Sequence, residues 1–107
     1  MRGRDLHHPH QTVSRREGNR LHLDGAVTTQ TTARVLTDAA EQVRDGVEVI
    51  DFSAVSEVDS AAVALALALV REARRLGRPI EFANLPPALA NLASLYAVAD
   101  FIPVAGR

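Results

Sequence analysis

The first folded segment of the chain shows strict alternation of polar and apolar positions. In residues 20–24 two leucines alternate with polar residues, which is typical of a strand with one buried face. A second strand-like segment covers residues 11–14, and Gly18-Asn19 between the two is a strong hairpin turn signal. The pattern predicts an antiparallel hairpin, with His22 on its polar face as a surface residue.

Three later segments have apolar residues at helical spacing and predict three helices. The first covers residues 32–44, is capped by one of the threonines around its start, and ends at Asp45-Gly46. The second covers residues 60–76; nearly every position of its first turns is apolar, which predicts burial on most sides. The third begins within residues 84–87, with proline in its first turn. Its expected buried face consists of Leu85, Leu89, Leu92, Ala93 and Tyr96.

Two more strands complete the pattern. Residues 47–52 are largely apolar, which predicts a central strand covered by helices on both faces, and residues 53–58 then form a loop. Residues 79–83 form the next strand. The unit from Val47 to Ala83 is strand–helix–strand, so its strands should be parallel with a right-handed crossover. We therefore predict a small α/β sandwich with a mixed sheet, an antiparallel hairpin in front and about three helices.

Composition narrows the possible chemistry. The chain has 107 residues and 47% apolar residues, enough for one domain with one core. It has no cysteine and no lysine, which excludes thiolate chemistry, Schiff-base lysines and a phosphate-binding loop. A net charge of −1 indicates no general attraction to nucleic acid or acidic membranes.

The ends of the chain predict no function of their own. Residues 1–10 are expected to be a disordered leader, residues 11–103 one domain, and residues 104–107 a frayed tail. His7, His8 and His10 could bind a metal, but no cysteine or carboxylate cluster completes a site, so neither metal nor cofactor is expected. The N-terminus has no apolar stretch of signal-peptide length, and the apolar run of residues 61–70 is too short to cross a membrane, so we expect a soluble cytoplasmic protein.

The stretch VDSAAVALALALV, residues 58–70, places Asp59 and Ser60 directly before the most apolar segment. One of the two is expected to accept a hydrogen bond from the first turn of the helix. A hydroxyl at this position also lies at the positive end of the helix dipole, where a phosphate would be stabilised and would add negative charge beside Asp59. The pair is thus a helix cap, a phosphorylation switch or a partner contact.

The same residues resemble the core of a STAS domain, the fold of anti-sigma-factor antagonists and of sulfate-transporter tails. Residues 50–53 (IDFS) and 58–60 (VDS) match the family's strand and helix-start motifs, and residues 23–25 (LDG) resemble the motif before its first helix. The resemblance covers about residues 20–103. Ala62 stands where the family usually has glycine, which bears on how closely a partner backbone could approach.

The ending LASLYAVADFIP, residues 92–103, resembles that of MlaB-like STAS subunits. This resemblance implies a non-catalytic subunit, peripheral to the inner membrane through its partner. The partner would be a cytoplasmic MlaF-like ATPase of an ABC transporter, in a complex with permease and lipid-binding subunits that maintains outer-membrane lipid asymmetry. The family's functional Ser/Thr falls on Ser60.

Two functions stay open at this point. In the first, Asp59 and Ser60, with Val63 and Leu67 at helical spacing, contact the transporter ATPase; core packing is the alternative for the two apolar residues, above all Leu67. In the second, the chain is an anti-sigma-factor antagonist that is phosphorylated on Ser60. No constellation of residues in the sequence supports an enzyme.

Overall fold

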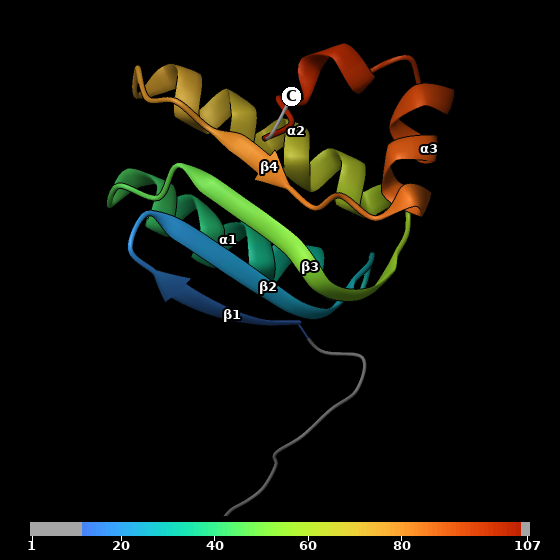
Figure 1. The fold of residues 1–107 in the computed structure, drawn as a ribbon, viewed down its shortest axis with the longest axis horizontal. Coiled ribbons are helices and arrows are strands. Elements are labelled where there is room, and N and C mark those ends of the chain that lie inside the picture. Colours follow the sequence, from blue (N-terminus) through green and yellow to red (C-terminus); the bar gives the residue numbers. More distant parts are fainter. Residues whose placement is uncertain (1–11, 106–107) are drawn as a thin grey trace, which may run out of the picture.

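The computed structural model describes residues 12–105 as one sheet with helices packed against it (Figure 1). The expected leader, with its three histidines, lies outside the described residues. The predicted α/β sandwich with a mixed sheet and three α-helices is confirmed. In chain order the elements are β1 (Thr12–Glu17), β2 (Arg20–Val27), α1 (Thr32–Arg44), β3 (Val49–Val58), α2 (Ser60–Arg75), β4 (Glu81–Ala83), α3 (Pro87–Leu95) and the 3-10 helix η1 (Ala99–Phe101).

The four strands of this sheet lie side by side in chain order, β1-β2-β3-β4. β1 and β2 form the predicted antiparallel hairpin, in which Glu17 is opposite Arg20. β3 runs parallel to both β2 and β4, so α1 and α2 are the crossovers of two successive parallel pairs. Parallel strands bring their carboxyl ends to one edge of the sheet, and there the chain turns from β3 into α2.

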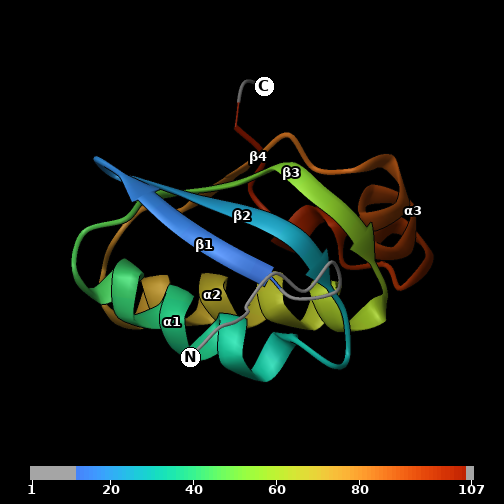
Figure 2. The same ribbon diagram turned by 90° about the horizontal axis from the view of Figure 1, so that it is seen from below.

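The helices lie on one face of the sheet, which corrects the expectation that β3 is covered by helices on both faces. Figure 2 shows α1 and α2 side by side beneath the strands, while α3 packs against α2. The core lies between the helices and the sheet, where the rings of Phe52 and Phe82 are 6.3 Å apart.

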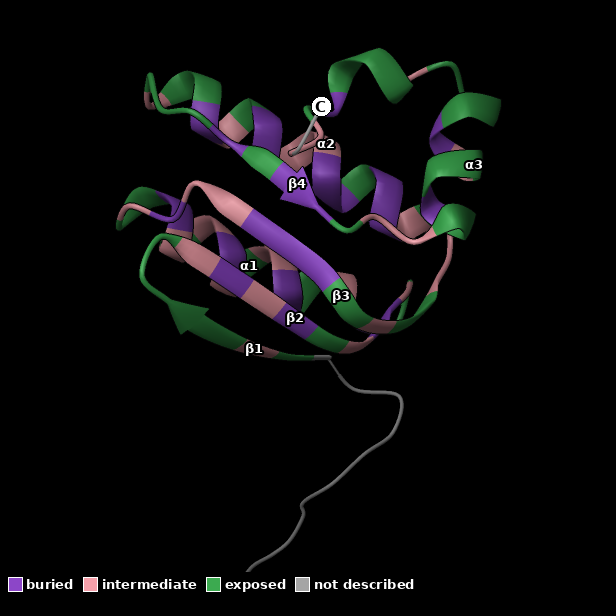
Figure 3. Ribbon diagram, viewed as in Figure 1, coloured by how far each residue is buried: buried purple, intermediate pink, exposed green. Residues whose placement is uncertain are grey.

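Asp51, between the buried Ile50 and Phe52, faces the other way and is covered by polar side chains. Asp51 is 4% exposed, so the middle of β3, which is purple in Figure 3, is buried on both of its sides although helices cover only one of them.

β3 is longer than predicted, because residues 53–58 continue the strand instead of forming a loop. This half pairs with the end of β2, and the register shifts twice, between His22 and Asp24 and again after Gly25. The φ of +103° at Gly25 is one that glycine adopts freely, which fits a bulged strand. The side chains of this half are mostly exposed, so backbone pairing rather than hydrophobic alternation extends the strand.

The C-terminal region differs from its prediction in two ways. Leu89 and Ala93 of α3 are buried as expected, but Tyr96 follows the helix and is 48% exposed. Val104 bridges to Phe82 of β4, and the N–H of Ala105 donates to the carbonyl of Phe82 at 3.0 Å. The tail therefore extends the edge of the sheet through Ala105 instead of fraying from Val104.

All three α-helices end in the same backbone motif. After each helix a residue with positive φ donates to the carbonyl three positions back, and the following N–H donates five positions back, as in a Schellman motif. Gly46 and Gly77 occupy the left-handed position after α1 and α2, as glycine at a helix end predicts. After α3 that position is Ala97, with φ +59°.

The threonines around the start of α1 do not cap it through their side chains, contrary to the prediction. Thr31 occupies the cap position, yet its hydroxyl donates to the carbonyl of Ala26 at 3.0 Å and accepts from the N–H of Thr28. This buried hydroxyl braces the β2–α1 turn instead. Within residues 12–105, no helix combines the length and the apolar character that crossing a bilayer requires.

Candidate functional site

The candidate site lies where β3 passes directly into α2. β3 ends at Val58, Asp59 is the cap, and α2 begins at Ser60, so no loop intervenes. Because β2 and β3 are parallel, the β2–α1 turn, including Thr29, lies beside this junction. The junction is thus held by two segments that are 30 residues apart in the chain.

Asp59 is the residue that caps α2 and ties the two segments together. Its Oδ1 accepts from the N–H of Ala61 at 2.8 Å, in the first turn of the helix. Its Oδ2 accepts from the N–H of Thr29 at 3.0 Å and from the Thr29 hydroxyl at 2.8 Å. The hydrogen bond from the backbone N–H of Thr29 has the largest effect on the pKa of Asp59 and lowers it. Desolvation raises this pKa, but the hydrogen bonds from Thr29 and Ala61 together prevail, so the pKa is lowered. Asp59 therefore stays ionised at neutral pH and performs the cap role left open by the sequence.

Ser60 is free of any structural role that the contacts reveal. Its side chain is exposed, and within residues 12–105 its hydroxyl forms no hydrogen bond. It lies at the first position of a 16-residue helix, where the backbone N–H groups of the first turn are at the positive end of the dipole. Ser60 is thus available to a partner or to a modifying enzyme, without competition from the fold.

The two apolar residues predicted to join this contact surface are placed differently. Val63 is only 4% exposed and belongs to the core, so of the two roles left open for it the structure supports core packing. Leu67 is half-buried and packs against the core, the alternative that its apolar character favoured. The outward side of this half of α2 instead carries the small residues Ala61 and Ala64, of which Ala64 is exposed.

A second polar cluster surrounds Asp51 on the open face of the sheet, and sequence reasoning assigned it no role. Its Oδ2 accepts from Arg20 Nη1 at 2.6 Å, and its Oδ1 accepts from Asn84 Nδ2 at 3.1 Å and from the N–H of Ser53 at 2.8 Å. Desolvation raises its pKa, but the hydrogen bonds, led by that of Asn84, prevail and lower the pKa to about 2. The match of residues 50–53 to the strand motif pointed to this residue without giving its partners.

Asp51 joins its own strand, β3, to β2 and to the turn after β4. Arg20 lies on β2 and Asn84 just after β4, while His22 of β2 has its Nδ1 3.7 Å from the carboxylate. All of the carboxylate's strong contacts are internal, so this cluster stabilises the strand order instead of presenting a reactive group. Both Asp51 and Asp59 have lowered pKa values. Within the part of the chain that the structure describes, only Asp59 has an exposed side chain without a hydrogen bond, that of Ser60, as its neighbour in the chain.

The chemistry of the junction fits binding. Ser60 has no hydrogen-bonded base within residues 12–105 to activate it as a nucleophile, and Asp59 is occupied by its three donors. In the same part of the chain no group of three His, Asp or Glu side chains is placed to hold a metal ion. The exposed Ser60, beside a fully hydrogen-bonded Asp59, makes the start of α2 the candidate contact surface.

Comparison with protein families gives one match that spans the domain. The family profile described as "Mlab, STAS domain" matches residues 10–103. No curated protein sequence matches the chain.

Comparison with solved structures identifies the same fold. The chain is similar to the anti-sigma factor antagonist SpoIIAA in its unphosphorylated form, with a TM-score of 0.66 and 15% identity over 90% of this chain and 89% of that one. It is also similar to the Bacillus cell fate determinant SpoIIAA in the phosphorylated form, with a TM-score of 0.62 and 15% identity over 90% of this chain and 92% of that one. At this identity the likeness establishes the fold.

Proposed function

Because this chain belongs to the MlaB-type STAS domain family, we propose that it is the non-catalytic STAS subunit of an ABC transporter. In this proposal it binds the transporter's cytoplasmic, MlaF-like ATPase and supports its assembly and activity. The complex, with its permease and lipid-binding subunits, moves phospholipids to maintain outer-membrane lipid asymmetry. The chain would then be cytoplasmic and held at the inner membrane by its partner.

The observation that carries the proposal is the division of roles between Asp59 and Ser60. Both carboxylate oxygens of Asp59 accept hydrogen bonds from within the domain, whereas Ser60, at the first position of α2, is exposed and forms none of these bonds. A partner that contacts Ser60 need not break any internal hydrogen bond. The hydrogen bonds of Asp59 to Thr29 and Ala61 already fix the geometry of the junction, so binding of a partner requires little ordering of this backbone.

The experiment is a pull-down of the tagged full chain from its native cell, followed by mass spectrometry of the co-purified proteins. The expected result is an ABC ATPase together with its permease and a lipid-binding subunit. The ATPase should then bind the purified chain in isolation. Recovery of a protein kinase of the anti-sigma class in place of the ATPase would overturn the proposal.

A second candidate function rests on the exposed hydroxyl itself. The solved relatives include SpoIIAA, an anti-sigma factor antagonist that exists in unphosphorylated and phosphorylated forms. In this alternative Ser60 is phosphorylated, and the added charge beside Asp59 repels an acidic partner surface. Incubation with the cognate serine kinase and ATP would add the mass of one phosphate, and Ser60→Ala would abolish the addition. An unchanged mass would exclude this alternative.

A further inference from the structure

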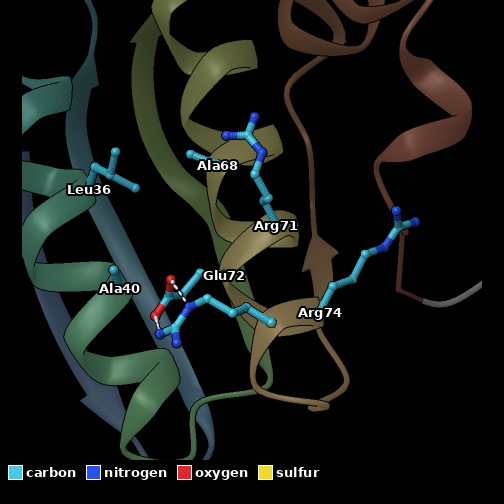
Figure 4. Close-up of a pocket in the computed structure, with 7 residues that line it drawn as sticks. Leu36, Ala40, Ala68, Arg71, Glu72 and Arg74 are labelled. Atoms are coloured by element: carbon cyan, nitrogen blue, oxygen red, sulfur yellow. Dashed lines mark hydrogen bonds and ion pairs between the residues drawn. The ribbon is translucent and has the colours of Figure 1, made fainter.

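A groove runs along the outer seam between α1 and α2, away from the sheet. One part of it is lined by Leu36 and Ala40 of α1 and by Ala68 of α2, next to four charged residues, and has a volume of about 620 Å³ (Figure 4). An adjoining part of about 360 Å³ shares Leu36, Ala68 and Arg71 with the first and extends to Ala61 and Ala64. The groove therefore begins beside Ser60 and follows α2 from Ala61 to Arg75, for about four turns.

The floor of the groove is apolar and shallow. Ala61, Ala64 and Ala68 of α2 recur at intervals of three and four residues and so share one face of the helix. Leu36 of α1 is half-buried and stands opposite them, as the larger apolar side chain of the seam. Alanine side chains are small and permit close approach of a second backbone, such as that of a helix.

The far end of the groove carries an excess of positive charge. Glu72 is bound by Arg44 at 3.1 Å and by Arg75 at 2.7 Å, which closes the seam with one carboxylate between two guanidinium groups. Arg71 and Arg74 also line this end, and within residues 12–105 neither forms an ion pair. This end of the seam thus carries four arginines and one carboxylate, and two of the arginines are not neutralised by it, which makes this end complementary to an acidic partner.

We infer that the groove binds an amphipathic helix of the ATPase partner, with its apolar stripe against Leu36 and Ala68 and its acidic residues beside Arg71 and Arg74. The inference rests on the proposed function and adds a second contact to the one at Ser60. The two contacts are continuous, since Ala61 follows Ser60 in the chain. A partner helix that starts near Ser60 could follow the seam to the arginines.

The test measures the affinity of the purified ATPase for the full chain and for four variants. Ala64→Glu places a charge on the apolar floor, and Arg71→Glu reverses the unpaired charge at the far end. Their matched controls are Ala88→Glu, on the exposed side of α3, and Arg34→Glu, an exposed arginine of α1 outside the groove. We expect each groove variant to weaken binding at least about tenfold and each control less than about twofold.

Hydrogen exchange of the wild-type chain, with and without the ATPase, provides a readout that does not depend on any variant. The expected result is added protection in residues 33–40 and 61–72. Binding of the ATPase without this protection, and with groove variants equal to their controls, would overturn the inference and leave the proposed function standing. Absence of ATPase binding by the wild-type chain would instead refute the proposed function, and the inference with it.

Discussion

Thr29 donates two hydrogen bonds to one carboxylate oxygen of Asp59, from its N–H at 3.0 Å and from its hydroxyl at 2.8 Å. The other carboxylate oxygen caps α2 through the N–H of Ala61. One side chain thus joins the β2–α1 turn, the end of β3 and the start of α2. Ser60, the next residue, contributes to none of these contacts.

This division predicts that two neighbouring substitutions have unequal effects on the free energy of unfolding. Asp59→Ala should lower the free energy of unfolding by about 1–2 kcal/mol, because the helix loses its cap and Thr29 loses its acceptor. Ser60→Ala should change it by less than about 0.5 kcal/mol, as expected for an exposed residue without contacts. Urea denaturation of both variants measures the difference. Equal destabilisation by the two would show that Ser60 shares the cap.

Asp51 predicts a loss of stability in acid. Its pKa is about 2 in the folded chain and 3.8 in the unfolded reference, so the unfolded state takes up the proton first. The stabilisation is therefore present above about pH 4 and is lost as the pH falls to about 2, and it amounts to about 2 kcal/mol.

Asp51→Asn removes this dependence on pH and should lower the free energy of unfolding at pH 7 by about 2 kcal/mol, because Arg20 loses its charged acceptor. Asp24→Asn, at an exposed position of the neighbouring strand, is the control. Urea unfolding between pH 2 and pH 7 checks both. If the slope of stability against pH in acid is the same in Asp51→Asn and in the wild-type chain, other carboxylates govern acid unfolding.

The Schellman motif that ends each helix predicts that glycine at its left-handed position stabilises the protein and that alanine there destabilises it. Ala97→Gly should raise the free energy of unfolding by about 1 kcal/mol, because glycine adopts the left-handed position without the clash of a Cβ. Gly77→Ala should lower it by a similar amount through φ alone, since an added Cβ there meets no atom within 4 Å. Thermal unfolding of both proteins tests this, and a shift in the same direction would contradict it.

The proposed contact at Ser60 predicts a change in partner affinity without a change in fold. Ser60→Arg or Ser60→Asp should leave the melting temperature unchanged and weaken ATPase binding at least about tenfold, because a charge would be desolvated at the contact. Ser94→Arg, at an exposed serine of α3, is the matched control. Full affinity of the Ser60 variants would move the contact elsewhere on the surface.

Local signals in the chain were sufficient for most of the elements. The bounds of α1 were predicted from apolar spacing and from Gly46, and the hairpin from Gly18-Asn19, because these signals act over a few residues. The extension of β3 was missed since its side chains are mostly exposed and only pairing with β2 makes it a strand. Whether Val63 packs in the core or contacts a partner stayed open in the sequence, because a segment apolar on every side does not show which side meets the core.

The candidate site divides in the same way. Local pattern and the family motif were enough to place Asp59 and Ser60 at the start of a helix, since cap residues and helix starts lie within a few positions of each other. Which of the two would be the cap depended on Thr29, 30 residues away. Asp51 likewise finds its partners 31 and 33 residues away, once the parallel strands have paired. The groove forms only when that pairing brings α1 and α2 side by side. Contacts between distant segments carry no local pattern, so tertiary packing alone decided which polar residues the fold uses and which it leaves to a partner.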